Sequence, residues 1–198
     1  MGSCFEGLAL PARIVPATPL SDDEFLAFCR ANEPYQFEQD AKGEIIVMTP
    51  SGGEGGNLEG YIFRELDLWV ERTGLGFAFN ASVCFRLPDK SLRMPDVAWV
   101  TLDRWNALSK SQKRKFPPFC PDFVVEVRSP SDRVKTVEAK MDVWMSNGAQ
   151  LAWLIDPIRK LAVVYRPGQQ PETLHRPEVI EGEGPITGFR LEMERFWA

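Results

Sequence analysis

The chain has 198 residues, 44% of them hydrophobic, which indicates one globular domain. Its formal net charge of −5 argues against a general nucleic-acid coat protein. It has no run of about 18 apolar residues and no basic segment leading into an apolar one near its start, so neither a membrane helix nor a secretory signal is expected. Four widely spaced cysteines and one histidine argue against a disulfide scaffold or a zinc site and favour the reducing cytoplasm.

The first half of the chain predicts short strands and two main helices. Residues 1–19 carry three prolines without periodicity and are expected to form a loose arm. Ser21 and Glu24 have the spacing of a capping box at the start of the first helix. The elements predicted next are a helix over 21–32, a hairpin with strands over 35–39 and 44–48, a glycine-rich loop over 50–56, a helix over 57–72, strands over 77–87 and 93–100, and a short helix over 101–109.

The second half predicts strands around one further helix, followed by a tail rich in proline and glycine. The predicted elements are strands over 121–128, 151–156 and 161–165, a helix over 132–147, and a final strand over 189–196. The tail after 167 is expected to be irregular, with short edge strands. The mixture of strands and helices indicates an α/β (α+β) fold in which helices cover the faces of a mixed sheet, with residues 20–198 as a single domain.

Two acidic residues each interrupt an otherwise apolar strand. An unpaired carboxylate there costs several kcal/mol of desolvation, so Asp96 and Glu126 both need partners. Side chains alternate along a strand, which places Glu126 on one face with Val124 and Arg128. If the two strands are neighbours, the two acids can bind one hard divalent cation for phosphodiester chemistry. Ion pairs with arginines are the ordinary alternative, and spacing alone does not decide between them.

Lys140 and Glu54 are candidates for the same site. Lys140 lies on the flank of the apolar stripe of its helix, where lysines usually extend into water. That helix directly follows the Glu126 strand, so its flank can also face the carboxylates. Glu54 stands among four glycines at the start of the helix over 57–72. It is either a solvated acid near a helix N-terminus or a further ligand for a metal or for water.

The basic run over 110–115 is the densest concentration of positive charge. A solvated loop is the ordinary interpretation of such a run. The alternative is that Lys113, Arg114 and Lys115, together with Arg133 further along the chain, contact the phosphates of DNA beside the acidic site. The run itself contains no aromatic or amide pattern suited to reading base edges, so any binding should be weakly sequence-specific.

Several strings, in this order, resemble the PD-(D/E)XK superfamily of restriction-endonuclease-like proteins and, within it, the Uma-two family of endonucleases. They are Met48–Gly55, Met94–Val97 and the long run from Pro121 through Asp156-Pro157. Together they lie within residues 35–167, which is most of the chain. The superfamily motif alone is degenerate, whereas the run that begins at Pro121 is far more specific.

The resemblance implies the restriction-endonuclease-like fold and a role for each site residue. Asp96 with its preceding proline would be the PD element, and Glu126 the second acid. Arg128 stands where the superfamily usually has its lysine, so Lys140 would replace that lysine, with Arg128 as the alternative source of positive charge. Arg128 cannot act as a general base, because its pKa stays above about 12. Glu54 would correspond to the acid or histidine that the family carries in or before its helix.

The implied activity is metal-assisted hydrolysis of DNA phosphodiester bonds. Asp96, Glu126 and Glu54 would hold Mg²⁺ or Mn²⁺, while Lys140 orients or deprotonates the attacking water or stabilises the charge on the phosphate. A homodimer is expected, because cutting a duplex needs two sites on opposite strands, with residues 1–19 and the tail after 167 as candidate interfaces. The alternatives are a catalytically silent nucleic-acid-binding or regulatory domain, and a structural module whose acids form ion pairs.

Overall fold

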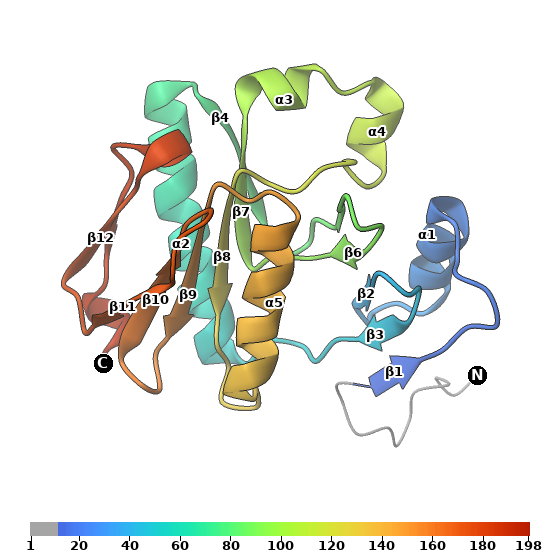
Figure 1. The fold of residues 1–198 in the computed structure, drawn as a ribbon, viewed down its shortest axis with the longest axis horizontal. Helices are drawn as coiled ribbons and strands as arrows, with labels where there is room; N and C mark the ends of the chain where they lie inside the picture. Colours follow the sequence, from blue (N-terminus) through green and yellow to red (C-terminus); the bar gives the residue numbers. More distant parts are fainter. Residues whose placement is uncertain (1–11) are drawn as a thin grey trace.

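The computed structural model describes residues 12–198, which form a six-stranded mixed sheet between two long helices, with a smaller N-terminal unit beside it (Figure 1). The strand order of the central sheet is β11-β10-β9-β8-β7-β4. Of its neighbouring pairs, β8 and β9 are parallel, and the others are antiparallel. The strands are β4 (Gly76–Asn80), β7 (Val97–Thr101), β8 (Phe123–Val127), β9 (Leu151–Asp156), β10 (Leu161–Tyr165) and β11 (Glu172–His175).

The two long helices, α2 (Gly53–Thr73) and α5 (Val134–Ser146), cover opposite faces of this sheet. The apolar stripe of α2 packs on the aromatic residues Trp99, Phe123 and Trp153. The stripe of α5 packs on the other side of the same strands, where the side chains are smaller. Alternation along each strand therefore sends one set of residues to α2 and the other set to α5.

The N-terminal unit has its own small core. Its sheet has the order β1-β3-β2-β6-β5 and is covered by α1 (Asp22–Ala31). The strands are β1 (Ala12–Ile14), β2 (Phe37–Gln39), β3 (Ile45–Val47), β5 (Phe85–Arg86) and β6 (Leu92–Arg93). Phe25 and Phe37 are buried between the helix and the sheet. Because β6 continues within a few residues into β7, this unit is tied directly to the central sheet.

The C-terminal tail packs against α2 and the central sheet. A hairpin of β12 (Val179–Glu181) and β13 (Arg190–Glu192) has a short 3₁₀ helix, Gly184–Ile186, in its connecting loop, and a second one, Glu194–Phe196, follows it. Phe189 stacks on Trp153 with ring centroids 5.8 Å apart, so the hairpin completes the core on the α2 face. The tail is therefore more ordered than the sequence predicts, because its spaced apolar residues bury themselves in a distant part of the fold.

Several predicted elements are confirmed and several are corrected. The capping box of Ser21 and Glu24 is present, and the hairpin forms as β2 and β3. The predicted strand over 77–87 divides into β4 and β5, which belong to different sheets. The strand over 93–100 similarly divides into β6 and β7, so Asp96 lies just before a strand. The basic run forms a short helix, α4 (Lys110–Arg114), which follows α3 (Leu102–Asn106).

Two further expectations are corrected: the point where the glycine-rich loop ends, and the extent of the loose N-terminal arm. Helix α2 begins at Gly53, inside the expected loop, and Glu54 in its first turn interacts favourably with the positive end of the helix dipole. Residues 12–14 of the expected loose arm pair with β3, and residues 1–11 lie outside the described residues. Over the described part of the chain, no helix is both long and apolar enough to cross a membrane.

Candidate active site

Asp96, one residue before β7, and Glu126, in β8, lie next to each other at the end of this antiparallel strand pair. Val97 is paired with Val125, and continuing this register by one residue sets Asp96 opposite Glu126. Directly opposed residues of an antiparallel pair have Cβ atoms about 4.5–5.5 Å apart. Both side chains point to the α5 face, since Ala98 and Val124, two residues along each strand, pack there.

The surrounding backbone and a tryptophan fix the positions of the two carboxylates. The backbone N–H of Val127 donates to Oδ2 of Asp96 at 2.6 Å. The indole Nε1 of Trp144 donates to Oε1 of Glu126 at 2.7 Å. Trp144 is fully buried within α5, so this hydrogen bond anchors Glu126 to a rigid part of the core.

Lys140 reaches the carboxylates from the middle of α5. Its Nζ donates to Oε2 of Glu126 and to the carbonyl oxygen of Met94, both at 2.9 Å. Its side chain is 17% exposed, so the flank of α5 faces the acids rather than bulk water. Neither acid pairs with an arginine within residues 12–198, which rules against the ordinary alternative of arginine ion pairs.

Glu38 is a third acid in this cluster, and the sequence analysis missed it. It lies on β2 of the N-terminal unit, is 2% exposed, and has Oε1 at 3.4 Å from Nζ of Lys140. Arg93 donates to Oε2 of Glu38 at 2.8 Å, and the backbone N–H of Met94 donates to Oε1, the oxygen that faces Lys140, at 3.0 Å. The signal that identifies Asp96 and Glu126, a lone acid in a short apolar strand, is missing at Glu38, because β2 reads Phe37-Glu38-Gln39.

The charges of this cluster shift one another's protonation. Burial first, and then the nearby Glu126, raise the pKa of Asp96 well above its usual range. Burial also raises the pKa of Glu126, against the opposing effect of Lys140. For Glu38 the burial effect is outweighed by Lys140 and Arg93, so its pKa is lowered. The three carboxylates overcome the burial of Lys140 and raise the pKa of its ammonium group.

Arg128 and Glu54 are not brought into this cluster. The guanidinium of Arg128 donates to both oxygens of the buried Asp156, at 3.2 and 3.1 Å, and to the carbonyl oxygen of Asp132. It therefore stabilises the loop between β8 and α5. Glu54 is exposed in the first turn of α2. Glu59, one turn further along α2, is instead the acid of this helix whose charge raises the pKa of Asp96.

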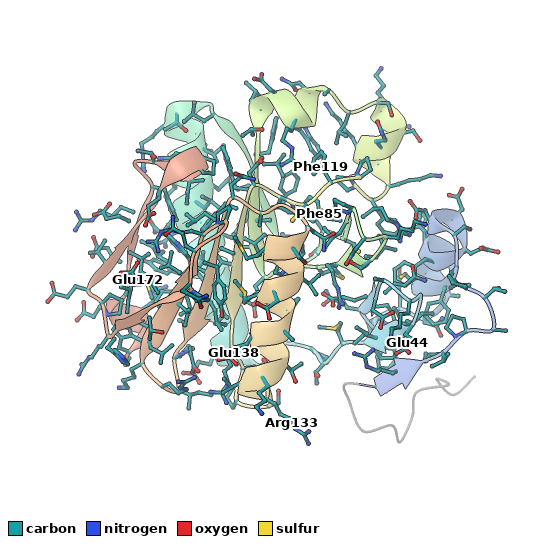
Figure 2. The ribbon with its side chains drawn as sticks, viewed as in Figure 1. Glu44, Phe85, Phe119, Arg133, Glu138 and Glu172 are labelled. Carbon is teal, nitrogen blue, oxygen red and sulfur yellow. The ribbon has the colours of Figure 1, made fainter. Side chains whose placement is uncertain are left out.

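The expected DNA-contacting residues fall into two separate places. Lys113, Arg114 and Lys115 lie on or beside α4, next to the N-terminal unit. Arg133 is the N-cap residue of α5, at the opposite end of that helix from α4 (Figure 2). The structure therefore does not join these four residues into one surface.

The oxygen donors of the site meet the needs of a divalent cation in part. Among residues 12–198, no three His, Cys, Asp or Glu side chains lie close enough together to hold a metal ion. Asp96 keeps its Oδ1 free of any hydrogen bond within that range. Mg²⁺ is usually held by one or two carboxylates, with waters and substrate phosphate completing its shell. The residues present fit such a two-carboxylate site, and they do not fit the three-carboxylate site expected with Glu54.

Comparisons with known proteins identify the family and the fold. The model of the Uma2 family, described as "Putative restriction endonuclease", matches residues 22–194. A crystal structure from Anabaena variabilis ATCC 29413, described as a putative nuclease belonging to DUF820, has a TM-score of 0.72 and 20% sequence identity. That likeness covers 90% of this chain and 98% of the other, and at this identity it shows the restriction-endonuclease-like fold. No curated protein matches the chain.

Proposed function

We propose that this chain, which belongs to the Uma2 family, is a nuclease that hydrolyses DNA phosphodiester bonds with the help of a divalent metal ion. The observation that carries the proposal is that Asp96 and Glu126 lie together at the end of the β7–β8 pair, where Nζ of Lys140 donates a hydrogen bond to Glu126. A purely structural pair of buried acids would place two like charges side by side at a cost of desolvation for each. Such a cost is typical of sites that serve chemistry rather than stability.

Asp96 and Glu126 would hold Mg²⁺ or Mn²⁺, which when bound lowers the pKa of a water molecule and neutralises charge on the phosphate. The hydrogen bonds from Val127 and Trp144 keep the two carboxylates in place before substrate arrives. Such preorganisation avoids an ordering cost during the reaction.

Lys140 has the role of a fixed positive charge. An ammonium group has three protons, and those of Lys140 face Glu126, Glu38 and the carbonyl oxygen of Met94. This arrangement leaves the nitrogen without a lone pair to accept a proton from water. Lys140 therefore stabilises the negative charge that develops on the phosphate, and the role of general base in the sequence-based hypothesis does not fit its surroundings.

The direct test is nicking of supercoiled plasmid in Mg²⁺, in Mn²⁺ and in EDTA. Glu126→Gln should lower the rate by roughly a thousandfold, because loss of a metal ligand removes several kcal/mol of transition-state stabilisation. Glu138→Gln is the matched control, because Glu138 is an exposed residue of α5 (Figure 2), and this variant should leave the rate unchanged. Glu54→Gln should also retain activity. Cleavage that continues in EDTA or in Glu126→Gln would reject the proposal.

A two-fold dimer is part of the proposed function, because a duplex cut needs one site for each strand. Residues after 167 are an unsuitable interface, since the tail packs into the chain's own core. Edge strand β4 is the better candidate, with exposed Leu75 beside it at 50% and Phe77 at 38%. Light scattering should give a dimer mass for the native protein and a monomer mass for Leu75→Lys. A native monomer at micromolar concentration would reject the dimer.

A further inference from the structure

A groove of about 340 Å³ opens between α1, the segment from β4 to β5, and the α3–α4 region, apart from the acids of the candidate active site. Its volume lies at the lower end of the roughly 300–1,000 Å³ of small-molecule pockets. The walls combine three aromatic rings, two lysines and a cysteine, which are Phe79, Trp105, Phe116, Lys113, Lys115 and Cys84. None of the aromatic residues belongs to the basic run itself, so only the folded chain brings the rings and the charges together.

Two of the aromatic rings of the groove, those of Phe79 and Trp105, are in contact. The ring of Phe79 lies 5.1 Å from that of Trp105, measured between centroids, with a tilt of 54°. Trp105 is half-buried, so part of its ring remains accessible from the groove. Nζ of Lys113 lies 5.3 Å from the centre of the same ring. The positive charge of Lys113 thus lies over one face of the Trp105 ring, and a base that stacks on this face takes the place of the ammonium group.

The two lysines differ in how far their charge is already neutralised. Lys115 is paired with Asp23 of α1, at 2.5 Å between Nζ and Oδ1. Lys113 has no ion pair anywhere in residues 12–198, and its recorded contact is with the Trp105 ring. The charge available to an anionic ligand is therefore that of Lys113, and it lies beside the aromatic surface rather than far from it.

The groove lies close to the proposed catalytic acids. Phe79 on β4 pairs with Ala98 on β7, and both pack on the α5 face of the sheet. Asp96 comes two residues before Ala98 on the same face. One strand spacing of about 4.8 Å and two residues of about 3.4 Å each give roughly 8 Å between the Cα atoms of Phe79 and Asp96. Two or three nucleotides of a stacked strand, at about 3.4 Å each, cover this distance.

We propose that this groove binds an unstacked base of a single-stranded DNA segment, with Trp105 stacking on the base, Phe79 packing against the edge of the base, and Lys113 moving from the Trp105 ring to the adjacent phosphate. The choice of a nucleic-acid ligand rests on the proposed function. Every base has a π face, so stacking of this kind tolerates different sequences. The substrate class is then DNA with unpaired bases beside the cut, and the groove gives that preference without reading base edges. A purely apolar ligand would leave Lys113 without a partner.

The test separates binding of the base from binding of the phosphates. Anisotropy of labelled strands would be measured in EDTA, so that no cleavage occurs, using an oligothymidylate and an abasic strand of the same length. The native protein should prefer the oligothymidylate. Trp105→Ala should abolish the preference, since one stacked base contributes about 1–3 kcal/mol, a factor of roughly 5 to 150 in affinity. Trp105→Phe retains a ring, controls for folding, and should keep most of the preference.

Lysine variants complete the design. Lys113→Ala should weaken binding of both strands, whereas Lys110→Ala, on the same helix but outside the groove, should have a smaller effect. Equal affinity of the native protein for the two strands, or an unchanged preference in Trp105→Ala, would overturn the groove even if plasmid is cleaved. Conversely, if the native protein prefers the oligothymidylate and Trp105→Ala abolishes this preference, base binding in the groove is supported. If the protein then cleaves plasmid under no metal condition, only the proposed function fails.

Discussion

The two faces of the central sheet are built from the same strands, yet they differ in chemistry. On the α2 face, β8 and β9 present Phe123, Val125, Leu151 and Trp153, and each of these is at most 1% exposed. On the α5 face, the same two strands present small apolar residues together with Glu126 and Asp156. Each strand therefore serves stability with one set of alternating residues and carries charge with the other.

The difference shows where a fold of this size can place buried charge. The α2 face is closed by a long helix and by the C-terminal hairpin, so a carboxylate there would have no partner. The α5 face adjoins the N-terminal unit, which contributes Glu38 and Arg93 to the cluster around Lys140. Buried charge is concentrated at the junction of the two units, where each supplies part of the compensation.

Trp153→Ala should produce the largest change, because it opens a cavity in the α2-face core. The Trp153 ring lies 4.9 Å from Phe123 and is fully buried. Truncation of a buried Trp typically lowers the unfolding free energy by about 3–5 kcal/mol. Trp153→Phe is the matched control and should cost less, since the indole Nε1 has no hydrogen-bond partner within the described residues. Urea denaturation measures both, and equal losses would show that ring volume is not what stabilises this face.

Lys140→Ala should give the second-largest change and lower the free energy of unfolding by about 3 kcal/mol. Removing it leaves Glu38 and Glu126 as neighbouring buried acids, and breaking a buried pair in this way costs about 3–5 kcal/mol. The lower end applies because the lysine side chain is 17% exposed. Lys135→Ala, at an exposed position of the same helix, should change stability by less than about 0.5 kcal/mol. Urea denaturation in EDTA measures the stability of both variants. Small losses in both would contradict the claim that Lys140 compensates the buried charges of Glu38 and Glu126.

Tyr165 on β10 should give a smaller, pH-dependent change. Burial, followed by Glu138 and Asp142 of α5, raises the pKa of its hydroxyl from 10.0 to about 12. The unfolded chain therefore loses this proton first, so stability should fall as pH rises from about 10 to 12, by about 1–2 kcal/mol. Below pH 10 the group contributes no slope. Unfolding of the native protein and of Tyr165→Phe should diverge over that window, and parallel curves would contradict the shift.

Local patterns predicted much of the fold. The capping box of Ser21 and Glu24 acts within one helical turn, and the stripe of α2 acts along one helix, so both are visible in a short stretch of sequence. The acids Asp96 and Glu126 were also identifiable, because a charged residue in an apolar strand conflicts with its surroundings. The strand order and the burial of the tail depend on contacts between distant segments, which periodicity does not contain.

Glu38 and the groove show the same limit within the functional regions. Glu38 meets Lys140 across about a hundred residues of sequence, and β2 was interpreted only as one strand of a hairpin. The basic run around Lys113 contained no aromatic residue, yet folding brings Trp105 and Phe79 beside it. Arg128 lies outside the cluster for a related reason, since its partner Asp156 is supplied by the neighbouring parallel strand.

Asp96→Asn should change stability least, by less than about 1 kcal/mol, although it should abolish plasmid nicking. The pKa of Asp96 is raised by burial and by Glu126, so the native state already disfavours its negative charge. An asparagine of the same shape keeps an oxygen to accept the hydrogen bond from the N–H of Val127, while it loses the charge that would hold a metal ion. Unfolding in EDTA and nicking in Mg²⁺ would be measured on the same preparation. A loss of several kcal/mol would mean that Asp96 stabilises the fold as the α2-face residues do. It would contradict the inference that the α2 face provides stability while the charged residues of the α5 face serve the candidate active site.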